Sequence, residues 1–264
     1  MPMQTILQEL AAYAAERTAN AKRKRPLFSI RADAELLPKG DFRFEKALRT
    51  DDIAFICECK KASPSKGLIA PDFPYLQIAK DYEAAGADCI SVLTEPSRFL
   101  GNDRYLAEIA QTVHIPCLRK DFTVDPYMIY EAKLLGASAV LLICALLDKS
   151  QLLEYHNIAE NLGLSALVEA HSEQEIETAA EIGARIIGVN NRNLHDFSVN
   201  TDHARQLRQY APEGTLFVTE SGMKTPEDIQ AARDAKADAV LIGETLMRAP
   251  DKAAMLRYLK GNNG

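Results

Sequence analysis

Two side chains of opposite charge stand two positions apart in the string CECKKASPSKG (57–67). Alternate side chains of a strand point to the same side, so Glu58 and Lys60 would face one cavity together. The pair could be a structural ion pair or an acid–base pair. Cys57 and Cys59 would then face the opposite side, and the chain's cysteines lack the paired spacing of a zinc site.

Further polar residues follow other apolar runs. Lys120 ends one run, and a lysine surrounded by other strand ends can serve as an acid, a base or an electrostatic clamp. Glu169 directly follows the apolar letters SALV, and His171 comes two positions later. A capping role for His171 is at least as plausible as chemistry. Because six or seven apolar runs end in this way, the pattern predicts one polar cavity.

Small residues follow the last two apolar runs. Ser221-Gly222 and Gly243 would let backbone N–H groups approach an anion, and barrels build phosphate sites in these loops. We expect the side chain of Glu244 to point away while its N–H contributes. Phosphate is therefore the predicted anion.

The elements that carry these residues form a repeat. In each repeat a segment with a helical pattern ends in a small residue and an alanine and is followed by a short apolar strand. Examples are EAAGADCISVLTE (83–95) and ARDAKADAVLIG (232–243). Strands alternating with helices indicate a parallel sheet. Eight strands are predicted, at Ile53–Cys59, Cys89–Thr94, Ile115–Arg119, Ala139–Ile143, Ala166–Glu169, Ile186–Val189, Leu216–Thr219 and Ala239–Ile242. Helix starts are marked at Asp125-Pro126, Ser172 and Thr225-Pro226.

Eight such alternations without a linker favour a single (β/α)8 TIM barrel over residues 51–264, within the length of 264 residues. Residues 1–50 do not fit the repeat and are predicted to be an N-terminal helical extension packed on the barrel. Residues Gln4–Thr18 have a helical pattern, and a second short segment of the extension covers Phe42–Arg49. The basic run Lys22–Arg25 between them is either a solvated face or a source of positive charge at the barrel mouth.

Composition excludes several classes of protein. Hydrophobic residues make up 47% and charged residues 26%, an ordinary globular balance, and the net charge of -6 argues against nucleic-acid binding. The longest apolar run, Ala139–Leu147, is too short for a bilayer, and the first residues do not resemble a signal peptide. We therefore expect a cytoplasmic protein that binds no membrane and whose five cysteines are free thiols.

Seven strings in this order resemble the indole-3-glycerol-phosphate synthase family of tryptophan biosynthesis. They are CECKKASPSKG (57–67), SVLTEPSRFLG (91–101), CLRKDF (117–122), LVEAH (167–171), IIGVNNRNL (186–194), TESG (219–222) and LIGETLMR (241–248). The resemblance covers the whole chain, extension included. It implies conversion of 1-(2-carboxyphenylamino)-1-deoxyribulose 5-phosphate to indole-3-glycerol phosphate, CO2 and water, without cofactor or metal.

The resemblance also implies roles for individual residues. Lys120 is the general acid at the ketone, and Glu169 is its carboxylate partner in dehydration. Lys60 and Glu58 are the second acid and its paired carboxylate. Asn190 and Ser221 complete the catalytic set, and the substrate-binding residues are Ser63, Phe99, Arg192, Glu220, Gly222, Leu241, Gly243 and Glu244. The implied partner is a small phosphorylated substrate, bound by a monomer with at most weak self-association.

Three alternatives stay open on the sequence. A barrel isomerase of the phosphoribosylanthranilate type would need a Cys/Asp acid–base pair. A Schiff-base aldolase would use Lys60 or Lys120 as the nucleophile. A protein that only binds an anionic metabolite would not need so many paired acids and bases.

Overall fold

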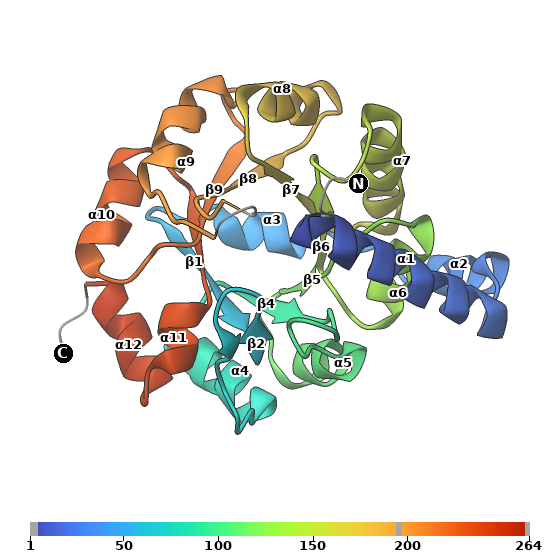
Figure 1. Ribbon diagram of the computed structural model, residues 1–264, viewed down its shortest axis with the longest axis horizontal. Helices are drawn as coiled ribbons and strands as arrows, with labels where there is room; N and C mark the ends of the chain where they lie inside the picture. Colours follow the sequence, from blue (N-terminus) through green and yellow to red (C-terminus); the bar gives the residue numbers. More distant parts are fainter. Residues whose placement is uncertain (1–4, 194–196, 262–264) are drawn as a thin grey trace.

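The computed structural model describes residues 5–193 and 197–261, and its centre is a closed barrel of eight parallel strands (Figure 1). The barrel strands are β1 (Ala54–Cys59), β4 (Cys89–Leu93), β5 (Cys117–Lys120), β6 (Ala139–Ile143), β7 (Ser165–Ala170), β8 (Ile186–Asn190), β9 (Leu216–Glu220) and β10 (Ala239–Ile242). The barrel closes where β1 pairs with both β10 and β4. The predicted fold class and all eight strands are confirmed, with ends that differ by one or two residues. Gln4 and Leu194, each at the end of a predicted segment, lie outside the described residues.

Side-chain alternation along the strands separates two apolar cores. In β1, Ala54 and Ile56 point into the barrel, whereas Phe55, Cys57 and Cys59 pack in the layer between strands and helices. Both faces of each strand are thus covered, which explains the continuous apolar runs. Glu58 continues the inward series of Ala54 and Ile56 and so reaches the open end of the barrel.

Helices surround this barrel. Their bounds are α1 (Ile6–Lys24), α2 (Leu27–Leu36), α3 (Arg43–Leu48), α4 (Tyr75–Ala84), α5 (Asp103–Thr112), α6 (Pro126–Leu134), α7 (Lys149–Leu162), α8 (Glu173–Glu181), α9 (Asp202–Leu207), α10 (Pro226–Asp234), α11 (Glu244–Arg248) and α12 (Lys252–Leu259), with a 3-10 turn at Arg208–Tyr210. A hairpin of β2 (Ala62–Ser63) and β3 (Gly67–Leu68) follows β1. The predicted helix starts are confirmed, because the side chains of Asp125, Ser172 and Thr225 each accept a hydrogen bond from a backbone N–H of the first turn.

The three helices before β1 contact both ends of the barrel. Helix α1 crosses the front of the barrel in Figure 1, and its Ile6, Leu7 and Leu10 line the cavity at the carboxyl ends of the strands. Helix α3 closes the other end, where Phe44 and Leu48 join the interior core. The extension therefore covers both openings and not only the mouth.

One helix of the extension was missed, and the structure decides between the two interpretations of its basic run. Helix α2 was not predicted, although Pro26 immediately before it is a helix-start signal. The basic run supplies no charge to the cavity, because Lys22 pairs with Asp125 at 2.5 Å and Arg25 pairs with Asp33. These basic side chains are used in local ion pairs outside the cavity. None of the helices in the described part of the chain is long and apolar enough to cross a membrane.

Candidate active site

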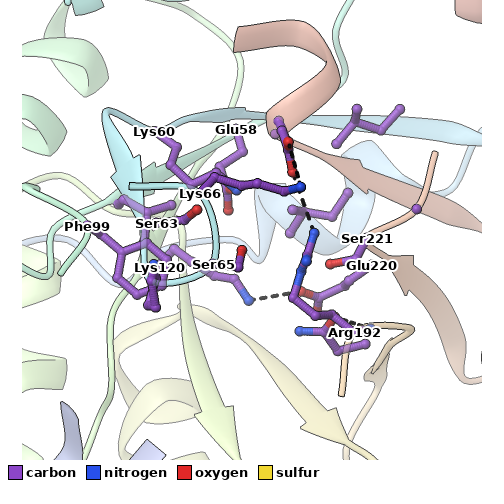
Figure 2. Close-up of a pocket in the computed structure, with 18 of the residues that line it drawn as sticks. Glu58, Lys60, Ser63, Ser65, Lys66, Phe99, Lys120, Arg192, Glu220 and Ser221 are labelled. Atoms are coloured by element: carbon purple, nitrogen blue, oxygen red, sulfur yellow. Dashed lines mark hydrogen bonds and ion pairs between the residues drawn. The ribbon is translucent and has the colours of Figure 1, made fainter. Parts of the chain in front are cut away.

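A cavity of about 660 Å³ opens at the carboxyl ends of the barrel strands. All fourteen residues predicted for the site line it, and Figure 2 shows labelled side chains converging on it from several strands and from the loop after β1. Strand ends of a parallel barrel meet at one face, so residues distant in sequence come together there. The structure therefore brings the whole predicted set together, while the chemical role of each member stays a prediction.

Lys120 lies between two buried carboxylates. Its Nζ is 3.0 Å from Oε2 of Glu169 and 2.9 Å from Oε2 of Glu220. Glu169 comes from β7, two strands from β5 around the barrel, and Glu220 comes from β9, directly opposite β5. Lys120 is thus a positioned ammonium with two hydrogen-bond acceptors, which is suited to giving a proton to a substrate oxygen.

The charges of this cluster shift one another's proton affinities. Burial lowers the pKa of Lys120, but the negative charges of Glu169, Glu220 and Glu58 outweigh burial and raise it. Burial raises the pKa of Glu169, but Lys120 and His171 outweigh burial and lower it. Burial and the charge of Glu169 raise the pKa of Glu220 despite the attraction of Lys120. Two carboxylates whose pKa values move apart are a pattern of acid–base sites.

A second ion pair lies at the end of β1. Lys60 Nζ is 2.6 Å from Glu58 Oε1, and the other carboxylate oxygen accepts a hydrogen bond from Ser91 at 3.4 Å. A Cβ atom on Gly243 would stand 2.3 Å from Glu58 Oε1 and 2.8 Å from Lys60 Nζ. Because glycine has no Cβ atom, position 243 provides the room that the Glu58–Lys60 pair occupies.

The end of the cavity nearest β9 and β10 combines small residues with cations. Ser221 and Gly222 both have positive φ, at 66° and 93°, a backbone shape that makes close approach possible. Gly243 begins α11 beside them. Lys66, Arg192 and Arg248 also line the cavity. These features suit a phosphate group.

The expectation for Glu244 was wrong. Its carboxylate lines the cavity and lies 3.6 Å from Arg192 and 3.9 Å from Lys66, and it pairs with Arg248 at 3.1 Å. Attraction to three cations from separate segments holds the side chain inward. The Glu244 carboxylate is therefore a counter-ion for these cations, whereas the role predicted for its backbone N–H stays a prediction.

The opposite end of the cavity is apolar. Phe99 packs against Phe122 with ring centroids 6.1 Å apart, whereas Leu241 lines the cavity from β10. Ile6, Leu7 and Leu10 of α1 complete this wall, together with Phe122. These four residues were not predicted to line the site. Phe122 stands in the CLRKDF string and could have been found, whereas the α1 residues carry no local signal.

Two residues predicted to lie beside the site rather than in it are placed as expected. Cys57 and Cys59 are buried in the outer core, and burial raises the pKa of both thiols. They face away from the cavity and cannot act in it. His171 Nε2 lies 3.0 Å from Glu169 Oε1. Among the described residues, no cluster of three or more His, Cys, Asp and Glu side chains could hold a metal ion.

The fold and cavity together define a (β/α)8-barrel enzyme with acid–base groups at the carboxyl ends of its strands. A family model described as indole-3-glycerol phosphate synthase matches residues 7–259. The chain belongs to the indole-3-glycerol phosphate synthase family.

Curated relatives span the full length. A protein from Ruminiclostridium cellulolyticum named indole-3-glycerol phosphate synthase is 55% identical over 258 residues, covering 97% of this chain and 99% of its own. A protein of the same name from Endomicrobium trichonymphae is 51% identical over 256 residues, with 97% and 99% covered. The match thus includes both the extension and the barrel.

Solved structures support the fold alone. A 3-hexulose-6-phosphate synthase from Salmonella typhimurium is 13% identical with a TM-score of 0.66, covering 80% of this chain and 98% of its own. A thiamine phosphate pyrophosphorylase from Pyrococcus furiosus is 15% identical with a TM-score of 0.59, covering 83% and 96%.

Proposed function

We propose that this chain is an indole-3-glycerol-phosphate synthase, which closes the indole ring of 1-(2-carboxyphenylamino)-1-deoxyribulose 5-phosphate with loss of CO2 and water. The observation that carries the proposal is the Lys120 ammonium held between Glu169 and Glu220 in a cavity with one apolar end and one cationic end. The phosphate of the substrate suits the cationic end, and the carboxyphenyl ring suits the apolar wall of Phe99, Phe122 and α1.

Ring closure requires a proton at the ketone oxygen. Lys120 is the group that gives it, because its two carboxylate partners keep it charged. Glu169 stays ionised and stabilises the positive charge that develops on the anilino nitrogen. Glu169 then takes the proton released from the neighbouring carbon in dehydration. The Glu58–Lys60 pair serves as the second acid, at the leaving hydroxyl, where Glu58 holds the ammonium in place.

The same charges disfavour the Schiff-base alternative. A nucleophilic lysine must be neutral, and it is activated by a lowered pKa. The pKa of Lys120 is raised instead, so its amine is a poor nucleophile. Borohydride in the presence of substrate is expected to leave the protein unlabelled, whereas an aldolase would be trapped as a covalent adduct.

We also infer that the working protein is a cytoplasmic monomer that needs no metal. All five cysteines are free, and four of them are fully buried, as suits a reducing compartment. The test of function is incubation of the purified chain with the carboxyphenylamino substrate and excess chelator, followed by mass spectrometry. One indole-3-glycerol phosphate and one CO2 per substrate are expected, and unchanged substrate would refute the proposal.

A further inference from the structure

His171 lies behind the proposed active site rather than in it. Its Nε2 is 3.0 Å from Oε1 of Glu169, while the other carboxylate oxygen of Glu169 is 3.0 Å from Lys120. Within the described residues that line the cavity, Glu169 and Lys120 are present and His171 is not. The three groups therefore form a hydrogen-bonded chain that runs from the cavity, through Glu169, to the imidazole.

The middle member of this chain is the least exposed, and the outer member is the most exposed. The Glu169 side chain is 3% exposed and the Lys120 side chain 12%, whereas the His171 side chain is 21% exposed. A substrate bound in the cavity would cover Lys120 and restrict water there. His171 stays accessible from the loop after β7, on the other side of Glu169.

The backbone of His171 is fixed at both ends. Its N–H donates to Oε2 of Glu175 at 2.7 Å, and its carbonyl oxygen lies 3.2 Å from Nε2 of His203. These contacts come from α8 and α9 and hold the backbone at His171, while the contact with Glu169 orients the ring. An imidazole that only capped a helix would not need to be held against a buried carboxylate.

The proposed reaction has a proton requirement that the cavity alone does not meet. In ring closure a bond forms between the ring carbon bearing the carboxylate and the ketone carbon, and the ketone oxygen takes one proton. The carboxylate then leaves as CO2, its bonding electrons returning to the ring. In dehydration the hydroxyl leaves with a second proton, and the carbon next to nitrogen releases one. Two protons are taken up and one is returned, so each turnover draws one proton from solvent.

We propose that His171 delivers a proton through Glu169 to recharge Lys120 after ring closure, while the intermediate occupies the cavity. His171 then carries away the proton that Glu169 takes from carbon in dehydration, and the net proton of each turnover enters at Lys60. The inference rests on the proposed function. His171 acts through Glu169 and does not touch the substrate, so it is a positioning and relay residue. The imidazole exchanges protons with solvent between these two transfers.

The surroundings of His171 suit this role. The titratable groups that face it are Glu169 on β7, Glu175 on α8, Glu220 on β9 and, at its carbonyl oxygen, His203 on α9. Burial lowers the pKa of His171, but the hydrogen bond with Glu169 and the three carboxylate charges outweigh burial and raise it. The ring therefore keeps its proton to a higher pH than an ordinary imidazole does, which suits a proton donor.

The test compares His171→Ala and His171→Asn with His114→Ala, a control at a side chain that is 97% exposed. Both variants at 171 are expected to lose about 10²-fold in kcat with little change in KM, which is the lower end of acid–base assistance. Imidazole is expected to restore His171→Ala, and substituted imidazoles should do so in proportion to their acidity. The loss should shrink as the pH rises far enough to deprotonate His171, because the unmodified protein then lacks the same donor.

Three outcomes separate the possible failures. A kcat for His171→Asn within twofold of the unmodified protein would show that the side chain only fixes Glu169, and the relay would be refuted. Equal losses in both variants without imidazole rescue would refute it as well. No product from the unmodified protein would overturn the proposed function itself. Circular dichroism checks that both variants are folded, and His171→Asn keeps a planar polar side chain if His171→Ala unfolds.

Discussion

Gly243→Ala is the smallest change that should disturb the proposed site. The added Cβ would stand 2.3 Å from Glu58 Oε1 and 2.8 Å from Lys60 Nζ, where ordinary contacts begin near 3.4 Å. The Glu58 carboxylate must therefore move by about 1 Å, a displacement that can cost about 10²-fold in rate at a catalytic group. The movement is restrained because Glu58 is 4% exposed and holds both Lys60 and Ser91.

The assay is the initial rate of indole fluorescence at varied substrate, with the melting temperature measured in parallel. We expect kcat to fall by about 10²-fold, because the misplaced carboxylate no longer holds the Lys60 ammonium. KM should rise, because the methyl group occupies the proposed phosphate end. The overpacked site should lose about 1–3 kcal/mol of stability.

Gly214→Ala is the matched control for this experiment. Gly214 has a φ of 82° and no other atom within 4 Å of an added Cβ, so alanine there strains only the backbone. Its stability loss should be about 1–2 kcal/mol, with unchanged kinetics. If Gly243→Ala kept kcat and KM within twofold of the control, the packing of Gly243 against the Glu58–Lys60 pair would have no part in catalysis.

Three further predictions concern charge, phosphate and thiols. Glu169→Gln keeps the shape of a side chain 3.0 Å from Lys120 but removes its charge, so turnover should fall about 10²-fold or more while affinity stays equal or improves; initial rates would contradict this if binding weakened and turnover did not change. Inorganic phosphate should compete with substrate, and Gly243→Asp should weaken its inhibition through bulk and like charge; an inhibition constant that did not change would remove the anion from the end of β10. Denatured, unreduced protein should titrate with five thiols, as all five cysteines are free, whereas three would indicate a disulfide.

The sequence predicted the barrel and its cavity because both depend on local patterns. Each strand is a short apolar run, and the polar residue that ends it, such as Lys120 or Glu169, lies at the same face by the geometry of parallel strands. Alternation along β1 also predicted that Glu58 faces inward and that Cys57 and Cys59 face outward.

The features that sequence reasoning missed depend on contacts between distant segments. Ile6, Leu7 and Leu10 line the cavity because α1 crosses the barrel mouth, and no pattern within α1 specifies that path. Glu244 points inward because Lys66 and Arg192 approach it from other loops. The basic run forms ion pairs with Asp125 and Asp33, which are chosen by packing of the helices.

The most direct test of the account compares the unmodified protein with Lys120→Met in the same indole fluorescence assay, without added metal or cofactor. Lys120 is the only one of the proposed groups that touches both Glu169 and Glu220. We expect indole formation by the unmodified protein and a turnover about 10²–10⁴-fold lower for a folded Lys120→Met, with substrate binding largely kept. A folded Lys120→Met with unimpaired turnover would contradict the assignment of Lys120 as the general acid.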